Sequence, residues 1–334
     1  MWNQACFITR LVSSTVRISE GAGSLIKRIM SEGDLKVVNK ATDGNADLQT
    51  EADRTAQYYI EKSLLAKFGD KLKIIGEEDV TSVVPHLEKE VCSDVLKQDS
   101  KCSEELRSIN PEDVVVWVDP LDGTSEFAQA AKSASRQFCF LRELFSLCDL
   151  ALLQQVTVLI GIAYKGRSIA GVVHQPYYAN GQGRTMWAIV GVGTFGIPVI
   201  GDNGSKVIVT TRSHSTPMVT EALDILTKQG LASSVERVGG AGYKVIKCLE
   251  GAAAYVFASP GCKKWDTAAP EALITACGGR LTDISGRPLY YGADAQITNT
   301  GGVLATPNWV KHDDYVNAMP EHVKTSLPEF SAKN

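Results

Sequence analysis

The feature that most constrains this chain is an apolar run that ends in two aspartates, from Val114 to Thr124, with the sequence V-V-V-W-V-D-P-L-D-G-T. Five consecutive apolar residues, mostly β-branched or aromatic, are typical of a strand buried on both faces. Pro120 cannot donate a hydrogen bond to a sheet ladder, so we expect the strand to end at Asp119. The glycine of D-G-T permits a tight turn, and Thr124 can begin a helix whose free N–H groups attract an anion. The sequence therefore predicts two carboxylates, Asp119 and Asp122, beside an anion-binding helix end.

Carboxylates next to an anion site imply a cation between them, because a phosphate and two aspartates otherwise repel each other. Hard oxygen ligands of this kind suit Mg²⁺. The alternative is a surface turn with solvated aspartates, since D-G-T alone is typical of a turn. A similar pattern occurs upstream, where the apolar strand Lys73 to Gly76 runs into Glu77, Glu78 and Asp79. Three acids at a strand end repel one another unless solvent separates them or cations join them.

The composition is that of a globular protein. The 334 residues suffice for one large domain or two ordinary ones, and 44% are hydrophobic and 22% charged. The net charge of −4 argues against general binding to nucleic acid or membrane surfaces, but it allows an anionic substrate held by metals and local cations. The cysteines are scattered without zinc-like spacing, and the first residues show no secretory signal. We therefore expect reduced thiols in a cytoplasmic protein without a membrane span.

Apolar periodicity predicts helices and strands in both halves of the chain. Helices are expected at Phe7–Met30, with a break near 21–23, from Asp47 towards Phe68, and at Thr216–Gln229, Tyr243–Gly251 and Thr267–Cys277. Strands are expected at Val156–Tyr164, Ser168–His174 (the two forming a hairpin), Thr185–Val192, Lys206–Thr210 and Ala254–Phe257. The polar stretch 81–112 is expected to be a loop with at most one short helix. Hairpins mixed with crossovers predict layered α/β structure with mixed sheets in two subdomains, 1–205 and 206–334.

Two further aspartates have a structural explanation when each is taken alone. Asp53 falls in the first turns of a predicted helix, where an acid interacts favourably with the helix dipole by roughly 0.3–1 kcal/mol. Asp266 precedes an Ala-rich helix, where an aspartate is a favoured N-cap. A functional role for either residue needs another observation.

Three acidic stretches together resemble the inositol monophosphatase superfamily of Mg²⁺-dependent, lithium-sensitive phosphatases: G-E-E-D at 76–79, D-P-L-D-G-T at 119–124 and W-D-T-A-A-P-E at 265–271. Within it, T-T-R-S-H-S and R-V-G-G-A-G-Y-K resemble the bisphosphate nucleotidases. The resemblance covers nearly the whole chain except about 129–155, and it implies a layered αβαβα sandwich of the inositol monophosphatase and fructose-1,6-bisphosphatase type. Haloacid dehalogenase-type phosphatases also carry D-G-T, but with D-x-D spacing in place of the D-x-x-D found here.

The resemblance also implies a role for each site residue. Metal ligands are implied at Glu77, Asp119, the backbone oxygen of Leu121, Asp122 and Asp266. Thr124, hydrogen-bonded to Asp53, is implied to position and deprotonate a metal-activated water, with no covalent intermediate. Substrate contacts are implied at Thr124, Thr211, His214, Gly240, Lys244 and Asp266, with Lys244 pairing with a 5′-phosphate. Taken alone, G-G-A-G would be a loose turn and His214 a surface histidine.

The implied reaction removes the 3′-phosphate of adenosine 3′,5′-bisphosphate and releases AMP and phosphate. The 2′,5′ and sulfated analogues of this nucleotide are implied as further substrates. The implied partner is this small nucleotide, with no nucleic-acid polymer and no membrane. Two alternatives stay open. One is an inositol phosphate phosphatase that shares the metal site. The other is a non-catalytic homologue that binds metal or nucleotide and is impaired by the atypical segment 129–155.

The segment 129–155 departs from the family, whose members join the helix after D-G-T to the next strand by a short connection. Apolar residues at helical spacing would suit an added amphipathic helix: Phe138, Leu141, Phe145, Cys148 and Leu152. The alternative is sequence that no selected fold accommodates, such as a retained intron translated in frame. We expect a protruding loop or helix outside the main sheets, with Val156 restarting the family strand. It could crowd the metal site or expose an apolar stripe.

Overall fold

The computed structural model describes residues 1–33, 35–40, 48–79, 84, 86–136, 146–197 and 199–328. Its strands are β1 (Val38–Asn39), β2 (Leu48–Gln49), β3 (Lys73–Gly76), β4 (Val114–Asp122), β5 (Thr157–Tyr164), β6 (Arg167–Gln175), β7 (Arg184–Ile189), β8 (Gly193–Phe195), β9 (Val207–Thr211), β10 (Ser234–Val238), β11 (Ala254–Phe257), β12 (Arg280–Thr282) and β13 (Val303–Thr306). They form a six-stranded sheet in the order β3-β4-β5-β6-β7-β8, a five-stranded sheet in the order β10-β9-β11-β13-β12, and the small pair β1-β2.

The helices are distributed along the whole chain. They are α1 (Phe7–Glu32), α2 (Glu51–Phe68), α3 (Ser93–Leu96), α4 (Glu104–Arg107), α5 (Thr124–Arg136), α6 (Leu147–Leu153), α7 (Tyr178–Gly181), α8 (Pro217–Lys228), α9 (Ala241–Leu249), α10 (Lys264–Ala276), α11 (His312–Ala318) and α12 (Glu321–Ser326), with 3₁₀ turns η1 (Trp2–Gln4), η2 (Asp99–Lys101) and η3 (Pro111–Asp113). In the described ranges, no helix is long and apolar enough to cross a membrane.

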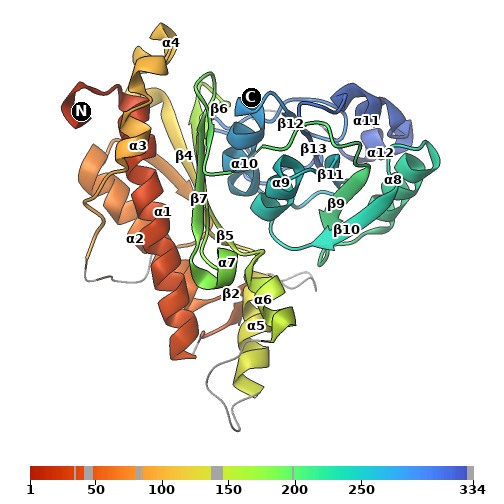
Figure 1. Ribbon diagram of the computed structural model, residues 1–334, viewed down its shortest axis with the longest axis horizontal. Coiled ribbons are helices and arrows are strands. Elements are labelled where there is room, and N and C mark those ends of the chain that lie inside the picture. The colour runs from red at the N-terminus through yellow and green to blue at the C-terminus, as the bar shows by residue number, and fades with distance from the viewer. Residues whose placement is uncertain are drawn as a thin grey trace.

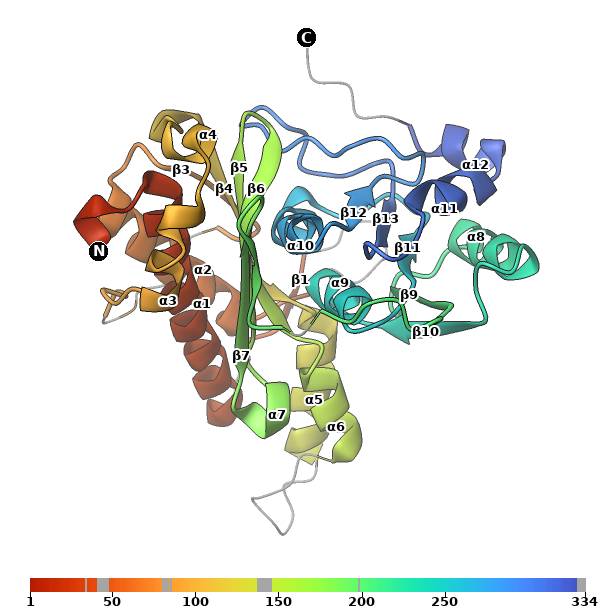
Figure 2. The same ribbon diagram turned by 45° about the horizontal axis from the view of Figure 1, so that its top comes forward.

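The elements stack in five layers (Figures 1 and 2). Helices α1 and α2 cover one face of the six-stranded sheet, α9 and α10 lie between the two large sheets, and α8 and α11 cover the far face of the five-stranded sheet. The predicted αβαβα sandwich with mixed sheets is therefore confirmed. The proposed boundary at 205/206 falls between β8 and β9, and the division into two subdomains stays a prediction.

Strand β4 is buried on both faces, as its apolar run predicts. Val114, Val116 and Val118 point into the core beneath α1 and α2, whereas Val115 and Trp117 point into the core between the two large sheets. Each face of one short strand thus packs against a different layer, which fixes the position of the two aspartates at its end.

The expected end of this strand at Asp119 is wrong, because β4 continues to Asp122. Asp119 pairs with Leu159 and Asp122 pairs with Thr157, and the register shifts between the two pairs. The missing N–H of Pro120 therefore falls inside an irregularity of the ladder, where no donor is needed. The same irregularity places both aspartates at one end of the strand.

The expected break in the first helix is also wrong, since α1 continues through the glycines at 21 and 23. A Cβ at Gly21 would lie 2.1 Å from the Tyr59 hydroxyl oxygen, and one at Gly23 would lie 2.4 Å from Nε2 of His174. These glycines permit close approach of α2 and β6 to the helix. A local pattern of glycines carries no information about such distant partners.

Helix α10 lies directly on the six-stranded sheet because glycines remove side chains from the contact. A Cβ at Gly161 would lie 2.4 Å from the Cβ of Ala268, and one at Gly171 would lie 2.6 Å from the carbonyl oxygen of Ala269. The close packing holds the helix that carries Asp266 against β5 and β6.

Other elements differ from the sequence-based expectations in smaller ways. The β5–β6 hairpin and strands β3 and β11 are confirmed. Helices α9 and α10 each begin earlier than expected, at Ala241 and Lys264. The described part of the stretch expected to be a loop contains α3, α4, η2 and η3. Other elements were not predicted: strands β1, β2, β8, β10, β12 and β13 and helices α7, α11 and α12. Strand β10 escapes notice because it lies at a sheet edge and its sequence S-V-E-R-V is largely exposed.

The described residues of the atypical segment form helices outside the sheets. Its first residues extend α5, and its last residues form α6, which packs against α5 (Figure 2). The Ser133 hydroxyl donates to Asp149 at 3.1 Å, and Ala130 and Leu153 are buried in the core beneath α1 and α2. Of the apolar positions predicted to form a helix, Phe138, Leu141 and Phe145 lie outside the described residues; Cys148 is exposed and Leu152 is buried.

We expect replacement of residues 137–145 by a short Gly-Ser linker to leave phosphatase activity unchanged or higher and to improve solubility. The replacement keeps α5, α6 and the hydrogen bond between Ser133 and Asp149, and it spares the buried Ala130 and Leu153. Phosphate release and the soluble fraction after expression are the measurements. A variant that no longer folds would show that this segment is part of the core.

Candidate active site

The predicted site residues lie together around one cleft of about 1060 Å³. Ten of them line it: Glu77, Asp119, Leu121, Asp122, Thr124, Thr211, His214, Gly240, Lys244 and Asp266. Residues at the ends of both large sheets therefore line the same cleft. Asp53 is fully buried behind the lining and contacts it through Thr124.

The acids reach the cleft from three separate elements. Strands β3 and β4 run parallel, so their carboxyl ends lie at the same edge of the sheet, and the Glu77 N–H donates to the Val118 carbonyl oxygen at 3.1 Å. Asp119 and Asp122 follow at the end of β4, and Asp266 comes from the first turn of α10. The packing of sheet and helix thus gathers carboxylates that are distant in the sequence.

Burial and mutual repulsion make these carboxylates unusual acids. Burial raises the pKa of Asp119 well above its ordinary value, and the nearby Glu77 raises it further. Burial likewise raises the pKa of Glu77, where Asp266 adds to the effect and Lys40 partly offsets it. Burial raises the pKa of Asp266 to about 6. A bound divalent cation would relieve this repulsion, and a donor set made of oxygens fits Mg²⁺.

The acids line the cleft, but their carboxylate oxygens do not form a tight group of three. Among the described residues, the one group of three His, Cys, Asp or Glu side chains whose ligand atoms all lie within 4.8 Å of one another is elsewhere in the fold. The expected gathering of the acids in one cleft is therefore observed, whereas their assignment as metal ligands stays a prediction.

Asp122 also joins the end of β4 to the first turn of α9, a role that sequence reasoning missed. Its carboxylate accepts hydrogen bonds from the backbone N–H groups of Ala241 at 2.7 Å and Gly242 at 2.9 Å, and from the Thr157 hydroxyl at 2.7 Å. Gly240 precedes these donors with φ of +61°, and a Cβ there would lie 2.9 Å from Oδ2 of Asp122. A glycine at this position lets the first turn of α9 approach the aspartate.

The geometry of Asp53 fits both roles considered for it, an acid in the first turn of a helix and a hydrogen-bond partner of Thr124. It lies in the first turn of α2, where its Oδ2 accepts the Thr50 backbone N–H at 2.8 Å as part of a capping box. Its Oδ1 lies 3.1 Å from Oγ1 of Thr124, the hydrogen bond that the resemblance implies. Burial raises the pKa of Asp53 to about 6.

The Thr124 hydroxyl has two acceptors within reach. It lies 3.1 Å from the Asp53 carboxylate and 2.9 Å from the Leu121 carbonyl oxygen. A hydroxyl has one proton to donate, so it can serve one acceptor at a time while its lone pairs stay able to accept. Engagement of the Leu121 carbonyl by another group would direct this proton to Asp53.

The N-cap explanation for Asp266 is wrong, because α10 begins earlier and its N-cap is Lys263. Asp266 is the third residue of the helix, and its Oδ2 accepts the Lys263 backbone N–H at 2.7 Å. The sulfur of Cys262 lies 3.4 Å from the same oxygen. Asp266 thus stabilises the helix start, and it also lines the cleft.

The predicted substrate residues Thr211, His214, Gly240 and Lys244 all line the cleft. The Thr211 hydroxyl accepts the backbone N–H of His214 at 3.1 Å, and the His214 side chain is exposed. Lys244 is buried, and its Nζ donates to the Gly240 carbonyl oxygen at 2.8 Å. Burial lowers the pKa of Lys244, while Asp122 opposes that shift.

Glu126 lines the cleft and was not singled out from the sequence. It is buried, and its Oε1, which makes no hydrogen bond, lies 3.4 Å from Nε of Arg212. Burial raises the pKa of Glu126, and Arg212 opposes that shift. The residue stands in the first turn of α5, where an acid is common for dipole reasons, so its sequence position gives no functional signal.

Several helices begin at the cleft. The first residues of α5, α8 and α9, namely Thr124, Pro217 and Ala241, all line it. The positive ends of helix dipoles favour anions, which explains how a chain of net negative charge can receive a phosphate ester.

Five α and β layers surround a cleft lined by carboxylates and helix N-termini, an arrangement that suits a phosphatase. The chain belongs to the inositol monophosphatase family, whose model matches residues 9–324. The resemblance inferred from the motifs is thus confirmed.

Two curated relatives and one solved structure illustrate the similarity. The chain is 44% identical over 337 aligned residues to 3′(2′),5′-bisphosphate nucleotidase 1 of Homo sapiens, covering 96% of this chain and 97% of that one. It is 33% identical to the protein of the same name in Dictyostelium discoideum, covering 93% and 96%. The extragenic suppressor protein suhB of Bartonella henselae has the same fold, with a TM-score of 0.63 at 20% identity over 92% of this chain and 97% of that one.

Proposed function

We propose that this protein hydrolyses the 3′-phosphate of adenosine 3′,5′-bisphosphate, and acts on its 2′,5′ and sulfated analogues. The observation that carries the proposal is the single cleft in which the acids near β3, β4 and α10 face the T-T-R-S-H-S and G-G-A-G-Y-K stretches. Relatives named bisphosphate nucleotidases align over almost the full chain, which supports the same substrate class.

The proposal includes a divalent cation, Mg²⁺, and the donor set described above fits it. Glu77, Asp119, the carbonyl oxygen of Leu121, Asp122 and Asp266 would hold it. When bound, Mg²⁺ neutralises phosphate charge and lowers the pKa of a bound water. Lithium inhibition belongs to the same proposal, on the basis of the family resemblance.

The chain's own groups position the attacking water. The Thr124 hydroxyl donates to Asp53, so a lone pair on its oxygen can accept a hydrogen bond from the water. The raised pKa of Asp53 makes its carboxylate a stronger proton acceptor than an ordinary aspartate. Thr211, His214 and Gly240 bind the nucleotide, and the glycine permits close approach of the backbone.

Lys244 is proposed to bind the 5′-phosphate. We expect Lys244→Met to raise the KM for adenosine 3′,5′-bisphosphate by about 10- to 100-fold, since a charged hydrogen bond contributes about 1.5–3 kcal/mol. The KM for 3′-AMP, which lacks the 5′-phosphate, should change much less. Lys247→Met is the matched control, because Lys247 pairs with Glu236 and does not line the cleft. Equal losses for both substrates would show that Lys244 acts only through structure.

A cytoplasmic location is part of the proposal. The described cysteines are all free thiols, as a reducing compartment would keep them. Subcellular fractionation with a tagged chain checks this assignment, and recovery in a membrane-bound compartment would contradict it.

The direct test is release of phosphate and AMP from adenosine 3′,5′-bisphosphate by the purified chain. We expect turnover that a chelator abolishes, that added Mg²⁺ restores and that Li⁺ inhibits. Turnover that continues undiminished in a chelator would contradict the proposed metal dependence, and absence of turnover with Mg²⁺ would contradict the proposed activity.

A further inference from the structure

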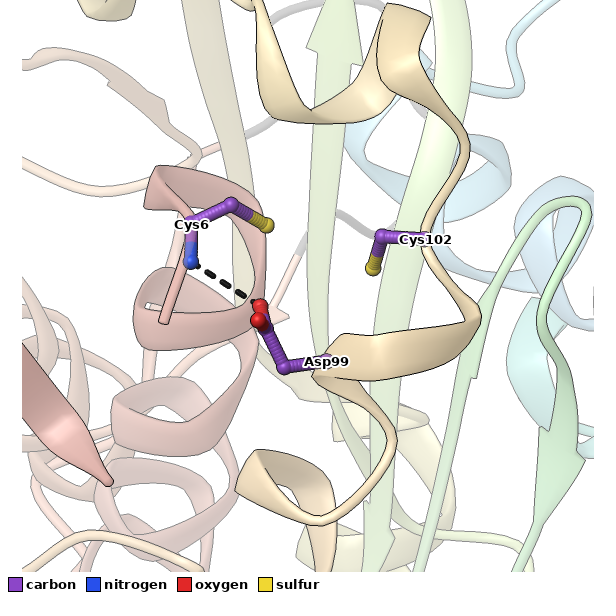
Figure 3. Close-up of side chains that lie close together, drawn as sticks. All are labelled: Cys6, Asp99 and Cys102. Carbon is purple, nitrogen blue, oxygen red and sulfur yellow. Dashed lines mark hydrogen bonds between the residues drawn. The ribbon is translucent and has the colours of Figure 1, made fainter. Parts of the chain in front are cut away.

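Two cysteines and an aspartate that are distant in the sequence meet at the N-terminus of α1 (Figure 3). Cys6 directly precedes α1, Asp99 is the first residue of η2, and Cys102 directly follows η2. The two sulfur atoms and one carboxylate oxygen all lie within 4.8 Å of one another. None of the three residues lines the active-site cleft.

Neighbouring groups fix the orientation of these side chains. The Cys6 backbone N–H donates to Oδ1 of Asp99 at 2.9 Å. The Thr9 hydroxyl lies 3.1 Å from the Cys6 sulfur and 3.4 Å from the Cys102 sulfur. The Arg107 guanidinium donates to Oδ2 of Asp99 at 3.2 Å and to the Cys102 carbonyl oxygen at 3.3 Å. Groups of this kind around metal ligands orient them and increase affinity.

The charges of the cluster balance if it holds a divalent cation. Two thiolates and one carboxylate carry three negative charges, which a divalent ion and the Arg107 guanidinium would neutralise. The start of a helix favours the thiolate of Cys6. The hydrogen bond between the two thiols lowers the pKa of Cys6 to about 6 and raises that of Cys102, so a bound cation has to displace the Cys102 proton. The sulfur ligands favour Zn²⁺ over Mg²⁺.

We propose that Cys6, Asp99 and Cys102 bind one Zn²⁺ ion, with water in the fourth position. Cys6 and Asp99 are half-buried, so solvent reaches the cluster, and three protein ligands plus one water form a common zinc coordination. The bound ion links the first turn of α1 to the segment that begins with η2. This site is separate from the phosphatase centre in both location and ligand chemistry.

Co²⁺ is the spectroscopic probe for this site. It is added to the full chain after chelator treatment, under reducing conditions. Excess Mg²⁺ is present to occupy the oxygen ligands of the cleft. We expect one equivalent of Co²⁺ to give a thiolate-to-cobalt charge-transfer band that Zn²⁺ removes. Cys6→Ser and Cys102→Ser should each weaken the band by about half or more, because one thiolate ligand remains, and the double variant should lose it. Cys148→Ser, at an exposed position on α6, and Cys262→Ser, next to Asp266, should keep it.

A second variant covers the case in which the serine variants fail to fold. Asp99→Asn keeps both sulfur ligands, so it should keep the band with weaker Co²⁺ affinity, and Zn²⁺ should raise the Tm of the unsubstituted chain more than that of this variant. A band of undiminished intensity in both single serine variants overturns the proposal. A second result would also overturn it: the chain gives no band with Co²⁺, and treatment with glutathione disulfide oxidises Cys6 and Cys102 to a disulfide. The cluster would then be a redox pair.

Discussion

Asp119→Asn is expected to abolish Mg²⁺-dependent phosphate release while the protein still folds. The substitution keeps the side-chain shape but removes a charge from the proposed ligand set. Charge stabilisation by a bound metal contributes several kcal/mol to catalysis, so turnover should fall by about 10³-fold or more. Phosphate release at saturating Mg²⁺ is the measurement.

Stability should move in the opposite direction in that variant. Burial raises the pKa of Asp119, and Glu77, Asp122 and Asp266 raise it further, so a neutral asparagine removes a buried charge and relieves repulsion among the acids. Without Mg²⁺, the Tm of Asp119→Asn should therefore equal or exceed that of the unsubstituted protein. Asp224→Asn, at an exposed position on α8 outside the cleft, is the control and should change neither quantity. Near-normal turnover in Asp119→Asn would show that the acid cluster has been misassigned.

Thr124→Val is expected to have the second large effect. Valine has a similar shape but cannot receive a proton from water or donate one to Asp53. Loss of a positioned proton acceptor typically reduces kcat by about 10²- to 10⁴-fold, and we expect a change of this size with little change in KM. Thr124→Ser retains the hydroxyl and should retain most of the activity. If valine and serine give equal activity, the hydroxyl does not handle the proton of the attacking water.

Sequence reasoning located the elements whose signal is local. Strands β3 and β11 were predicted with their observed bounds, because each is a short apolar run between turn residues. The glycines of α1 misled the prediction, because their reason is close packing against Tyr59 and His174. The end of β4 was misplaced because a ladder irregularity accommodates Pro120. Errors of this kind arise wherever the conformation of a residue depends on contact with a residue that is distant in the sequence.

The same limit applies to the site. Motifs identified four of the five acids that line the cleft, since their residue types and the family resemblance agree. The hydrogen bonds from α9 to Asp122, the buried Glu126 and the cluster of Cys6 with Cys102 were missed, because each depends on contacts between distant segments. Spacing alone could not reveal a site whose two cysteines are separated in the sequence by α1, α2, β3 and α3.

Substrate preference tests the central claim most directly. Phosphate release should be measured side by side for adenosine 3′,5′-bisphosphate, inositol 1,4-bisphosphate and inositol 1-phosphate, at one Mg²⁺ concentration and with the same preparation. The proposed contacts at Thr211, His214, Gly240 and Lys244 predict the highest kcat/KM for the nucleotide. Equal or better turnover of inositol 1-phosphate would contradict the account and favour an inositol phosphate phosphatase.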